Sequence, residues 1–295
     1  MSTFLSSAEI CAIVSQYGVR KASFSPDVLL LRGIMAGAFI AFASEGSNMA
    51  AFNLLASPDT YGLGRCVAGI VFPTGLMLVM LTGSELFTGN TMMGVAASQR
   101  QITWGAMLRN WLWVYGGNAV GSILVALMMA HSGLFNSGAG LLGGVTAKIA
   151  LNKVSLSFTE AFVLGVMCNW LVCLAVWFAY GAKDAAGKIL GIFFPIWLFI
   201  TSGFEHSVAN MYYIPAGILA KSNEAWIAAA GLSSAALADL TWVNFVIHNL
   251  VPVTLGNILG GMVFVGMAHQ YAFGGGKTGQ HVALGVSASP SAQDR

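Results

Sequence analysis

TGSELFTGN at residues 82–90 and TSGFEHSVAN at residues 201–210 are two polar, glycine-bearing stretches. Each interrupts a long apolar segment near its middle, the first at 66–98 and the second at 187–219. Helices broken at matching places in two halves of a membrane protein are the best sequence indication of a transport site. Two such breaks facing each other predict a pore.

The composition indicates that the solvent around most of the chain is lipid. Of 295 residues, 57% are hydrophobic and 8% are charged, whereas an ordinary soluble domain has about 25% charged residues. A helix needs about 20 apolar residues to cross the hydrocarbon core. We therefore predict an all-α integral membrane protein with one six-span transport domain at 28–272. The predicted spans are 29–55, 66–98, 106–130, 158–181, 187–219 and 243–270.

The two ends of the chain differ from the spans. Residues 1–27 carry Ile10, Ile13, Val14 and Tyr17 at helical spacing, which predicts an amphipathic helix on the membrane surface or on a neighbouring subunit. The tail at 273–295 is rich in Gly, Ser, Pro and Gln and is predicted to be disordered. With six spans, nine of the 13 basic residues share a side with the N-terminus. We therefore expect both termini to be cytoplasmic, in the cell (inner) membrane.

The two halves of the chain resemble each other. NWLWVYGGNAVG at 110–121 matches NLVPVTLGNILG at 249–260, Phe-Pro opens both broken spans at 72 and 194, and both breaks contain Glu-x-x-x-x-Asn. These matches predict two three-span repeats, at about 28–132 and 156–272. An odd number of spans makes the copies antiparallel, so the two breaks converge from opposite sides of the membrane.

Ionisable residues within the spans are costly and are by default candidates for function. Glu45, Glu85, Glu160 and Glu205 have a structural alternative, because a carboxyl group can accept backbone N–H groups of an unwound turn. His206 differs, since its imidazole can donate or accept and its charge can change near neutral pH. We hypothesise that His206 passes a proton to an anion, with a purely structural histidine as the alternative.

TSGFEHSVANMYYIPAGI at 201–218, GSELFTGN at 83–90 and CNWLVCLAVW at 168–177 closely resemble the formate/nitrite transporter family, over about residues 8–272. The resemblance implies an aquaporin-like architecture, a pore in each protomer and a homopentamer. It implies that His206 is the central pore histidine, that Thr88 lies in a mobile loop, and that Lys153 and Asn169 flank the histidine. It also implies an apolar constriction; the residues at its positions here are Phe72, Leu76, Leu86 and Phe199.

These features predict a pH-dependent channel or transporter for a small monovalent anion, which passes with protons. Formate is the first choice, with nitrite or hydrosulfide as alternatives. Lys153, Glu205 and Asn210 are predicted to be polar groups of the path. In a rival mechanism, a plain anion channel is gated by the loop at 86–88 and His206 is only part of the gate.

A neutral-solute channel of aquaporin type is the other function considered. Its paired Asn-Pro-Ala half-helices have no counterpart at 90–92 (NTM) or 210–212 (NMY). The sequence carries no nucleotide-binding glycine loop and no HExxH pair, so we predict no enzyme activity, no cofactor and no metal site. Nucleic acid is not an expected partner.

Overall fold

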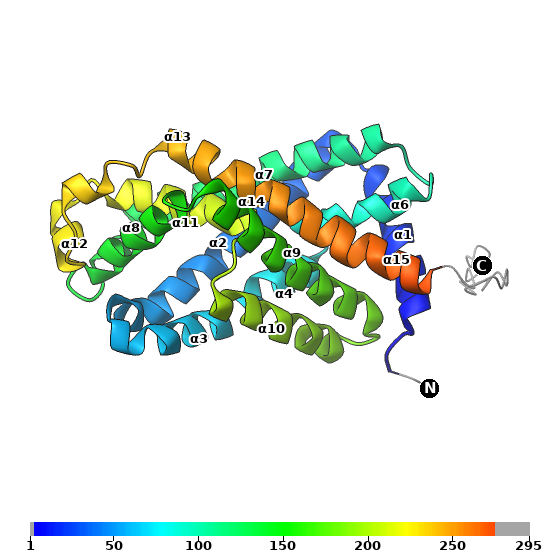
Figure 1. Cartoon of the computed structure of the whole chain (residues 1–295), viewed down its shortest axis with the longest axis horizontal. Helices are drawn as coiled ribbons and strands as arrows, with labels where there is room; N and C mark the ends of the chain where they lie inside the picture. Colours follow the sequence, from blue (N-terminus) through cyan, green and yellow to red (C-terminus); the bar gives the residue numbers. More distant parts are fainter. Residues whose placement is uncertain (1–2, 275–295) are drawn as a thin grey trace, which may run out of the picture.

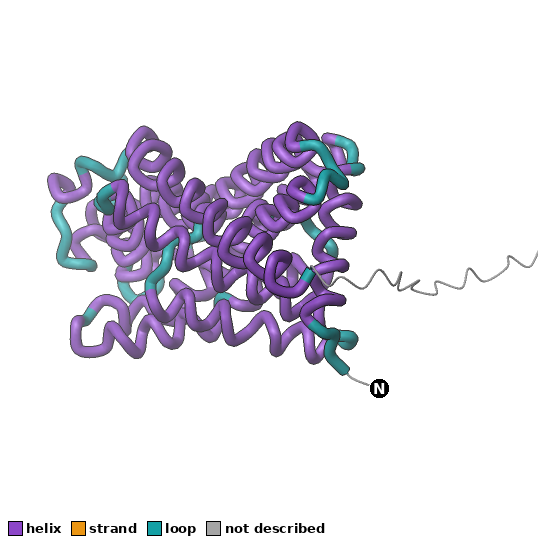
Figure 2. The backbone as a smooth tube through the Cα atoms, turned by 45° about the vertical axis from the view of Figure 1, so that its right-hand side comes forward, coloured by secondary structure: helices purple, strands orange, loops and turns teal. Residues whose placement is uncertain are grey.

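The computed structural model of the protein describes residues 3–274, which are almost entirely helical (Figures 1 and 2). Six helical segments are long and apolar enough to cross a membrane, as the sequence predicts. Most of the predicted disordered tail, from residue 275 on, lies outside the described residues. The six segments are Pro26–Ala56, Pro58–Thr82, Trp104–His131, Phe158–Gly181, Ala185–Ser202 and Trp242–Phe273.

The helix expected near the N-terminus is α1, Ser7–Ala22. Its start is fixed by a capping box, in which Ser6 and Glu9 satisfy each other's backbone N–H groups. The buried face of α1 packs against α6 (Gly94–Ser98), α9 (Phe158–Gly181) and α15 (Ala268–Phe273) of the same chain. Figure 1 shows α1 and α15 at the same end of the molecule.

Two helix pairs form the centre of the fold. α2 (Pro26–Ala56) packs along α7 (Trp104–His131), and α9 packs along α14 (Val251–Ile258) and the following turns. Glycines allow these backbones to touch. A Cβ atom on Gly121 would overlap the carbonyl oxygen of Ile34, and one on Gly260 would overlap that of Val166.

The segment that contains the first polar stretch is divided into short helices. α3 (Tyr61–Val71) and α4 (Pro73–Thr82) follow a 3₁₀ turn at Pro58–Thr60, so this segment begins about eight residues earlier than predicted. α4 ends at Gly83, whose φ of 75° is the left-handed conformation that glycine adopts readily. Helical structure resumes with α5 (Phe87–Asn90), a 3₁₀ turn (Thr91–Met93) and α6.

The segment that contains the second polar stretch has a similar course. α10 (Ala185–Ser202) ends at Gly203, with φ of 83°, and α11 (Ser207–Ala220) begins four residues later. Pro195 lies inside α10 and Pro215 inside α11. Because the backbone between α10 and α11 is not helical, its side chains and peptide groups are free to make tertiary contacts.

The structure contains one substantial helix that we did not predict. α8 (Leu141–Val154) is too short and too polar for a span, yet it packs against α11 and α2 and places Lys153 in its last turn. After α11 comes the short helix α12 (Glu224–Ala229). The last span consists of α13 (Trp242–Asn244), α14 and α15, which are joined by π-helical turns at Phe245–Leu250 and Leu259–Met267.

Candidate functional site

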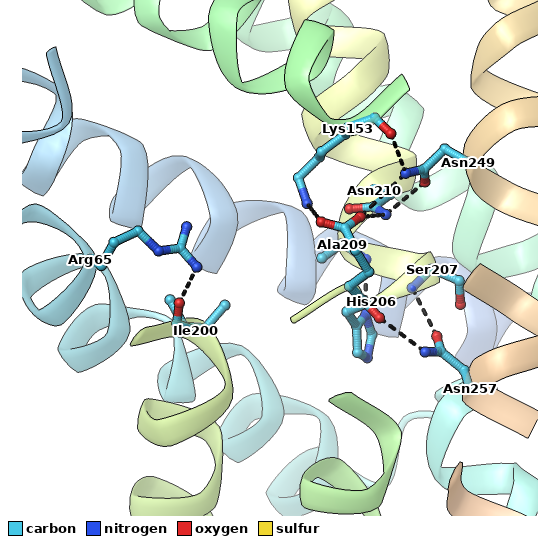
Figure 3. A network of polar contacts seen from close by, with 10 residues as sticks. Arg65, Lys153, Ile200, His206, Ser207, Ala209, Asn210, Asn249 and Asn257 are labelled. Carbon is cyan, nitrogen blue, oxygen red and sulfur yellow. Dashed lines mark hydrogen bonds and ion pairs between the residues drawn. The ribbon is translucent and has the colours of Figure 1, made fainter. Parts of the chain in front are cut away.

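His206 lies at the junction of the two breaks. Its Nε2 atom is 3.0 Å from Oγ1 of Thr88, and its side chain is 3% exposed. Its Nδ1 atom accepts the backbone N–H of Ala209 at 3.0 Å, which caps the first turn of α11 (Figure 3). A nitrogen that accepts a hydrogen bond must keep its lone pair. The ring proton of the neutral imidazole is therefore on Nε2 and points toward Thr88.

Asn169 holds the backbone around Thr88 rather than the imidazole of His206. From α9, its Nδ2 atom donates to the carbonyl oxygen of Thr88 at 3.1 Å, to Oγ1 of Thr91 at 3.1 Å and to the carbonyl oxygen of Asn257 at 2.6 Å. Asn169 is fully buried. It thus fixes the loop that carries Thr88 against the last span.

The predicted constriction residues fill the interior beside this pair. The rings of Phe72 and Phe199 meet edge to face, with centroids 5.5 Å apart, and the Phe199 ring lies 6.1 Å from the His206 ring. Leu76 and Leu86 belong to the same buried core. All four are at most 3% exposed. In this conformation, apolar side chains therefore fill the interior where the sequence predicts the constriction.

The first break is held by a network around Glu85. Its carboxylate accepts from Nδ2 of Asn90 at 2.7 Å and pairs with Nζ of Lys21 at 3.1 Å. The amide of Asn90 also donates to Oδ1 of Asn110, whose own Nδ2 donates to the carbonyl oxygen of Lys21. Asn118 bridges the break, because it accepts from the N–H of Phe87 and donates to the carbonyl oxygen of Glu85.

The second break is held by the same kinds of contact around Glu205 (Figure 3). Its carboxylate accepts from Nδ2 of Asn210 at 2.6 Å and pairs with Nζ of Lys153 at 2.7 Å. Asn210 donates to Oδ1 of Asn249, whose Nδ2 donates to the carbonyl oxygen of Lys153. Asn257 accepts from the N–H of Ser207 and donates to the carbonyl oxygen of Glu205.

The matched residues that precede the breaks keep a constant spacing. Lys21 and Lys153 are 132 residues apart, and so are Gly33 and Gly165, whose carbonyl oxygens accept from the two bridging asparagines. The two lysines are almost equally exposed, at 16% and 15%. A glutamate, a lysine and three asparagines therefore make largely the same contacts twice in one chain.

Two cavities are lined by residues of the two breaks. One, of about 190 Å³, contains the first break and four cations; its charged lining residues are Arg20, Lys21, Arg32, Lys188 and Glu85. The other, of about 40 Å³, is lined by His206 and by two further cations, Lys153 and Arg65. Neither is lined by Phe72, Leu76, Leu86 or Phe199. We call them the first and the second vestibule.

Arg65 enters the second vestibule from α3. Its guanidinium donates to the carbonyl oxygen of Ile200 in the last turn of α10 (Figure 3). The C-terminus of a helix carries partial negative charge, so a cation is favourable there. The contact also leaves Arg65 beside the path without a carboxylate partner among residues 3–274.

Two sequence-based interpretations need correction. Glu160 is exposed and closes a capping box with Ser157 at the start of α9, so it is not a buried polar group of the span. Phe72 and Phe194 are not equivalent, because the Phe72 side chain is 1% exposed whereas that of Phe194 is 58% exposed. The glycine and glutamate of the two breaks are 120 residues apart, but these phenylalanines are 122 apart.

Sequence reasoning missed Lys21 and gave no role to the asparagines that hold the breaks. Asn110, Asn118, Asn249 and Asn257 stood in the matched stretches, but only the structure shows their contacts. Asn118 and Asn257 bridge backbone groups of the breaks, and Asn110 and Asn249 join the asparagine side chains of the breaks to the backbone of Lys21 and Lys153. The spacing of 132 residues between Lys21 and Lys153 could have identified Lys21. Residues 3–274 contain no group of three His, Cys, Asp or Glu residues that could hold a metal ion.

Comparison with known proteins gives consistent matches. A family model described as formate/nitrite transporter matches residues 8–271. The chain is 38% identical to the formate channel FocA of Escherichia coli K12 over 269 residues, which is 89% of this chain and 92% of that protein. It is 40% identical to the formate channel BtFdhC of Bacillus thuringiensis over 263 residues, covering 88% and 93% of the two chains.

Solved structures give the same result. A structure described as a pentameric formate channel with formate bound matches with a TM-score of 0.77 and 39% identity, over 84% of this chain and 97% of that one. A second solved structure, described as an FNT family ion channel, matches with a TM-score of 0.73 and 32% identity, over 90% of this chain and 98% of that one. The match therefore covers the membrane domain from one end to the other.

Proposed function

This chain belongs to the formate/nitrite transporter family, and from that membership we propose that it is a pH-dependent channel or transporter for a small monovalent anion, with formate as the main substrate. It is a multi-pass membrane protein, and the relatives named above are channels. The observation that carries the proposal is the contact of His206 with Thr88 beside a closed apolar constriction, with a cationic vestibule at each break. Nitrite and hydrosulfide are the alternative substrates. We propose no enzyme activity.

The architecture proposed for this function is an inverted repeat. The matched contacts of Glu85 and Glu205 support two equivalent halves, with both long helices broken at membrane depth. Lys21 lies on α1 and Lys153 on α8, and the two lysines make matching contacts. Each repeat is therefore proposed to include the helix before its first span, which is α1 in the first repeat and α8 in the second. In an antiparallel pair of this kind the substrate site lies where the two breaks meet. Here that place is the pair of His206 and Thr88.

The assembly and orientation are proposed on separate grounds. A homopentamer with a pore through each protomer is supported by the solved structure described as pentameric. α1 contacts α15, and Sγ of Cys11 lies 3.5 Å from the carbonyl oxygen of His269, which supports placing both ends of the domain on one side. The distribution of basic residues favours the cytoplasmic side of the inner membrane for both.

Charge in the vestibules supports an anion rather than a neutral solute. Four cations and one carboxylate line the first vestibule, and Lys153 and Arg65 line the second. The pKa of Lys21 is raised: burial alone lowers it, but the Glu85 carboxylate and nearby tyrosines outweigh that effect. Lys21 is therefore charged at neutral pH. Each vestibule can raise the local concentration of an anion before it reaches the constriction.

The constriction favours passage of a neutral molecule. Transfer of an unpaired carboxylate into an apolar environment costs tens of kcal/mol in the Born limit, and the rings of Phe72 and Phe199 offer no hydrogen bond donors. Protonation of a carboxylate with a pKa near 4 costs only about 4 kcal/mol at pH 7, at 1.36 kcal/mol for each pKa unit. Neutralisation before the constriction is thus the easier route, and it would couple passage to protons.

The tautomer of His206 limits how it can take part. Its single ring proton, on Nε2, can be donated in a hydrogen bond to the anion. Full transfer would require Nδ1 to gain a proton, and Nδ1 already accepts from the N–H of Ala209. We propose that water ordered by His206 and Thr88 relays a proton from the bulk solution to the anion, taking up one proton as it gives up another, while Nε2–H stabilises the anion. In the rival mechanism, the loop at 86–88 opens for the anion itself.

Flux of labelled formate, nitrite and hydrosulfide through purified protein in liposomes, at pH 5.5 and 7.5, tests the function. The proposal expects saturable formate flux that is faster at the lower pH. Equal leakage in protein-free liposomes would reject it. Saturable flux of nitrite or hydrosulfide, with formate at background, would replace formate as the main substrate.

A further inference from the structure

The second vestibule contains two amide atoms that have no hydrogen-bond partner among the described residues. They are Nδ2 of Asn48, on α2, and Oδ1 of Asn210, on α11. Both residues line the cavity beside His206, and their side chains are 2% and 0% exposed. A buried polar atom left without a partner destabilises the protein, because it loses its hydrogen bond to water and gains none in return. Two such atoms in residues that line one small cavity therefore indicate a site where a bound molecule would supply the missing hydrogen bonds.

The chemistry of its neighbours fixes which atom of Asn210 is free. The amide nitrogen donates to Oε2 of Glu205 at 2.6 Å and to Oδ1 of Asn249 at 2.7 Å. A carboxylate can only accept, and Nδ2 of Asn249 is already directed to the carbonyl oxygen of Lys153 at 2.9 Å. Rotating the Asn210 amide would break both contacts. The free atom is thus an acceptor, and it remains directed away from the network.

The first half of the chain provides an internal comparison. The equivalent atom, Oδ1 of Asn90, accepts from Nζ of Lys21 at 2.5 Å. In the second half, Nζ of Lys153 binds Oε1 of Glu205, so Asn210 is left without that partner. The spacing of 132 residues that relates the two lysines also relates Asn48 to Tyr180, which lines the first vestibule. Asn48 and Tyr180 therefore each line a vestibule. At this position the second vestibule has the amide of Asn48, whereas the first has the phenol ring of Tyr180.

We propose that Asn48 and Asn210 form a binding subsite for the protonated, neutral form of a small carboxylic acid, and this inference rests on the function proposed above. The amide of Asn48 donates to the carbonyl oxygen of the acid, and Oδ1 of Asn210 accepts the hydroxyl hydrogen. A carboxylate has no hydrogen to give to Asn210, so the pair selects the neutral acid. The cavity, at about 40 Å³, exceeds the 10–15 Å³ that one water needs.

The concentration dependence of formate flux in liposomes tests this subsite. Asn48→Leu removes the amide at similar volume and is expected to raise KM about tenfold while the maximal flux is retained. Asn152→Leu is the matched control, because Asn152 is exposed on α8 and lines a different cavity. In the wild type, KM expressed as the concentration of neutral acid is expected to stay constant between pH 5 and 7.

Two outcomes separate the subsite from the proposed function. Saturable wild-type flux, together with an Asn48→Leu variant whose KM equals that of the wild type and of Asn152→Leu, would overturn the subsite and leave the function intact. Absence of formate flux in the wild type would reject the function itself. If the leucine variant is not recovered folded, Asn48→Ala repeats the test with a smaller side chain.

Discussion

The Nε2 atom of His206 lies 3.0 Å from Oγ1 of Thr88, so a single side-chain pair joins the two breaks of the chain. The two residues are 118 positions apart in sequence, and both side chains are buried. Each break is held independently by its own glutamate and asparagines. The contact is therefore the point at which a movement of one break would reach the other.

Thr88→Val keeps the shape of the side chain and removes the hydroxyl group. We expect formate flux to fall at least tenfold, because the imidazole N–H loses its partner and the hydroxyl group that would help to order water beside His206 is gone. The loss in unfolding free energy should be only about 1 kcal/mol. Thr88→Ser retains the hydroxyl and should keep most of the flux. Equal flux in the valine and serine variants would remove Thr88 from the mechanism.

Lys153→Ala leaves the buried Glu205 carboxylate without its cation. Breaking a buried pair in this way should destabilise the protein by about 3 kcal/mol or more, seen as a lower Tm, and should lower anion flux. The double variant Lys153→Met with Glu205→Gln leaves no unpaired charge, so Tm should recover. If flux recovers with it, electrostatic recruitment by Lys153 is wrong and the lysine is only structural.

The Lys21 and Glu85 pair gives a control for pH effects. The pKa of Lys21 is raised above its ordinary value of 10.5, since burial is outweighed by the carboxylate. The stability contributed by this charge is therefore fully present below that value and is lost only as the pH rises through the raised pKa. We expect Tm to be insensitive to Lys21 titration between pH 5 and 8. The double variant Lys21→Met with Glu85→Gln leaves no unpaired charge and should keep this pH dependence of Tm; a changed dependence in this window would contradict the assignment.

Close helix packing at the glycines can be tested by glycine-to-alanine substitutions, each of which adds one methyl group. Gly121→Ala and Gly260→Ala would push a methyl group into a carbonyl oxygen of the neighbouring helix, so we expect low yield or a Tm lowered by several degrees. Gly116→Ala is the matched control, because a Cβ atom there meets no atom within 4 Å. A Tm of Gly121→Ala equal to that of the control would show that α2 and α7 are less closely packed than described.

Much of the fold could be predicted because a membrane restricts the choices. Long apolar segments must be helices when their backbone groups cannot reach water, and the six spans follow from that rule. α8 could not be found in this way, since a short helix buried in protein needs neither length nor continuous apolarity. Its lysine, Lys153, was predicted as a site residue from family resemblance, but its placement on a helix was not.

The candidate site was predictable to a different extent. His206 was evident because it is ionisable and lies within a break, and Phe199 followed from resemblance. Lys21 lies outside every span, and its ammonium meets Glu85 only through tertiary packing. The free amide of Asn48 was also hidden, because a sequence does not show which polar atoms lack partners. Contacts between distant segments are the part that sequence reasoning could not supply.

We propose above all that formate takes up a proton beside His206 and crosses the constriction as the neutral acid. The most direct measurement is the proton-to-formate ratio in liposomes under a clamped membrane potential, for the wild type and for His206→Ala and His206→Phe. We predict one proton moved with each formate, no dependence on the potential, and a pH profile that changes when His206 is replaced. A formate flux that follows the potential, carries no proton and keeps its pH profile in both variants would contradict the account.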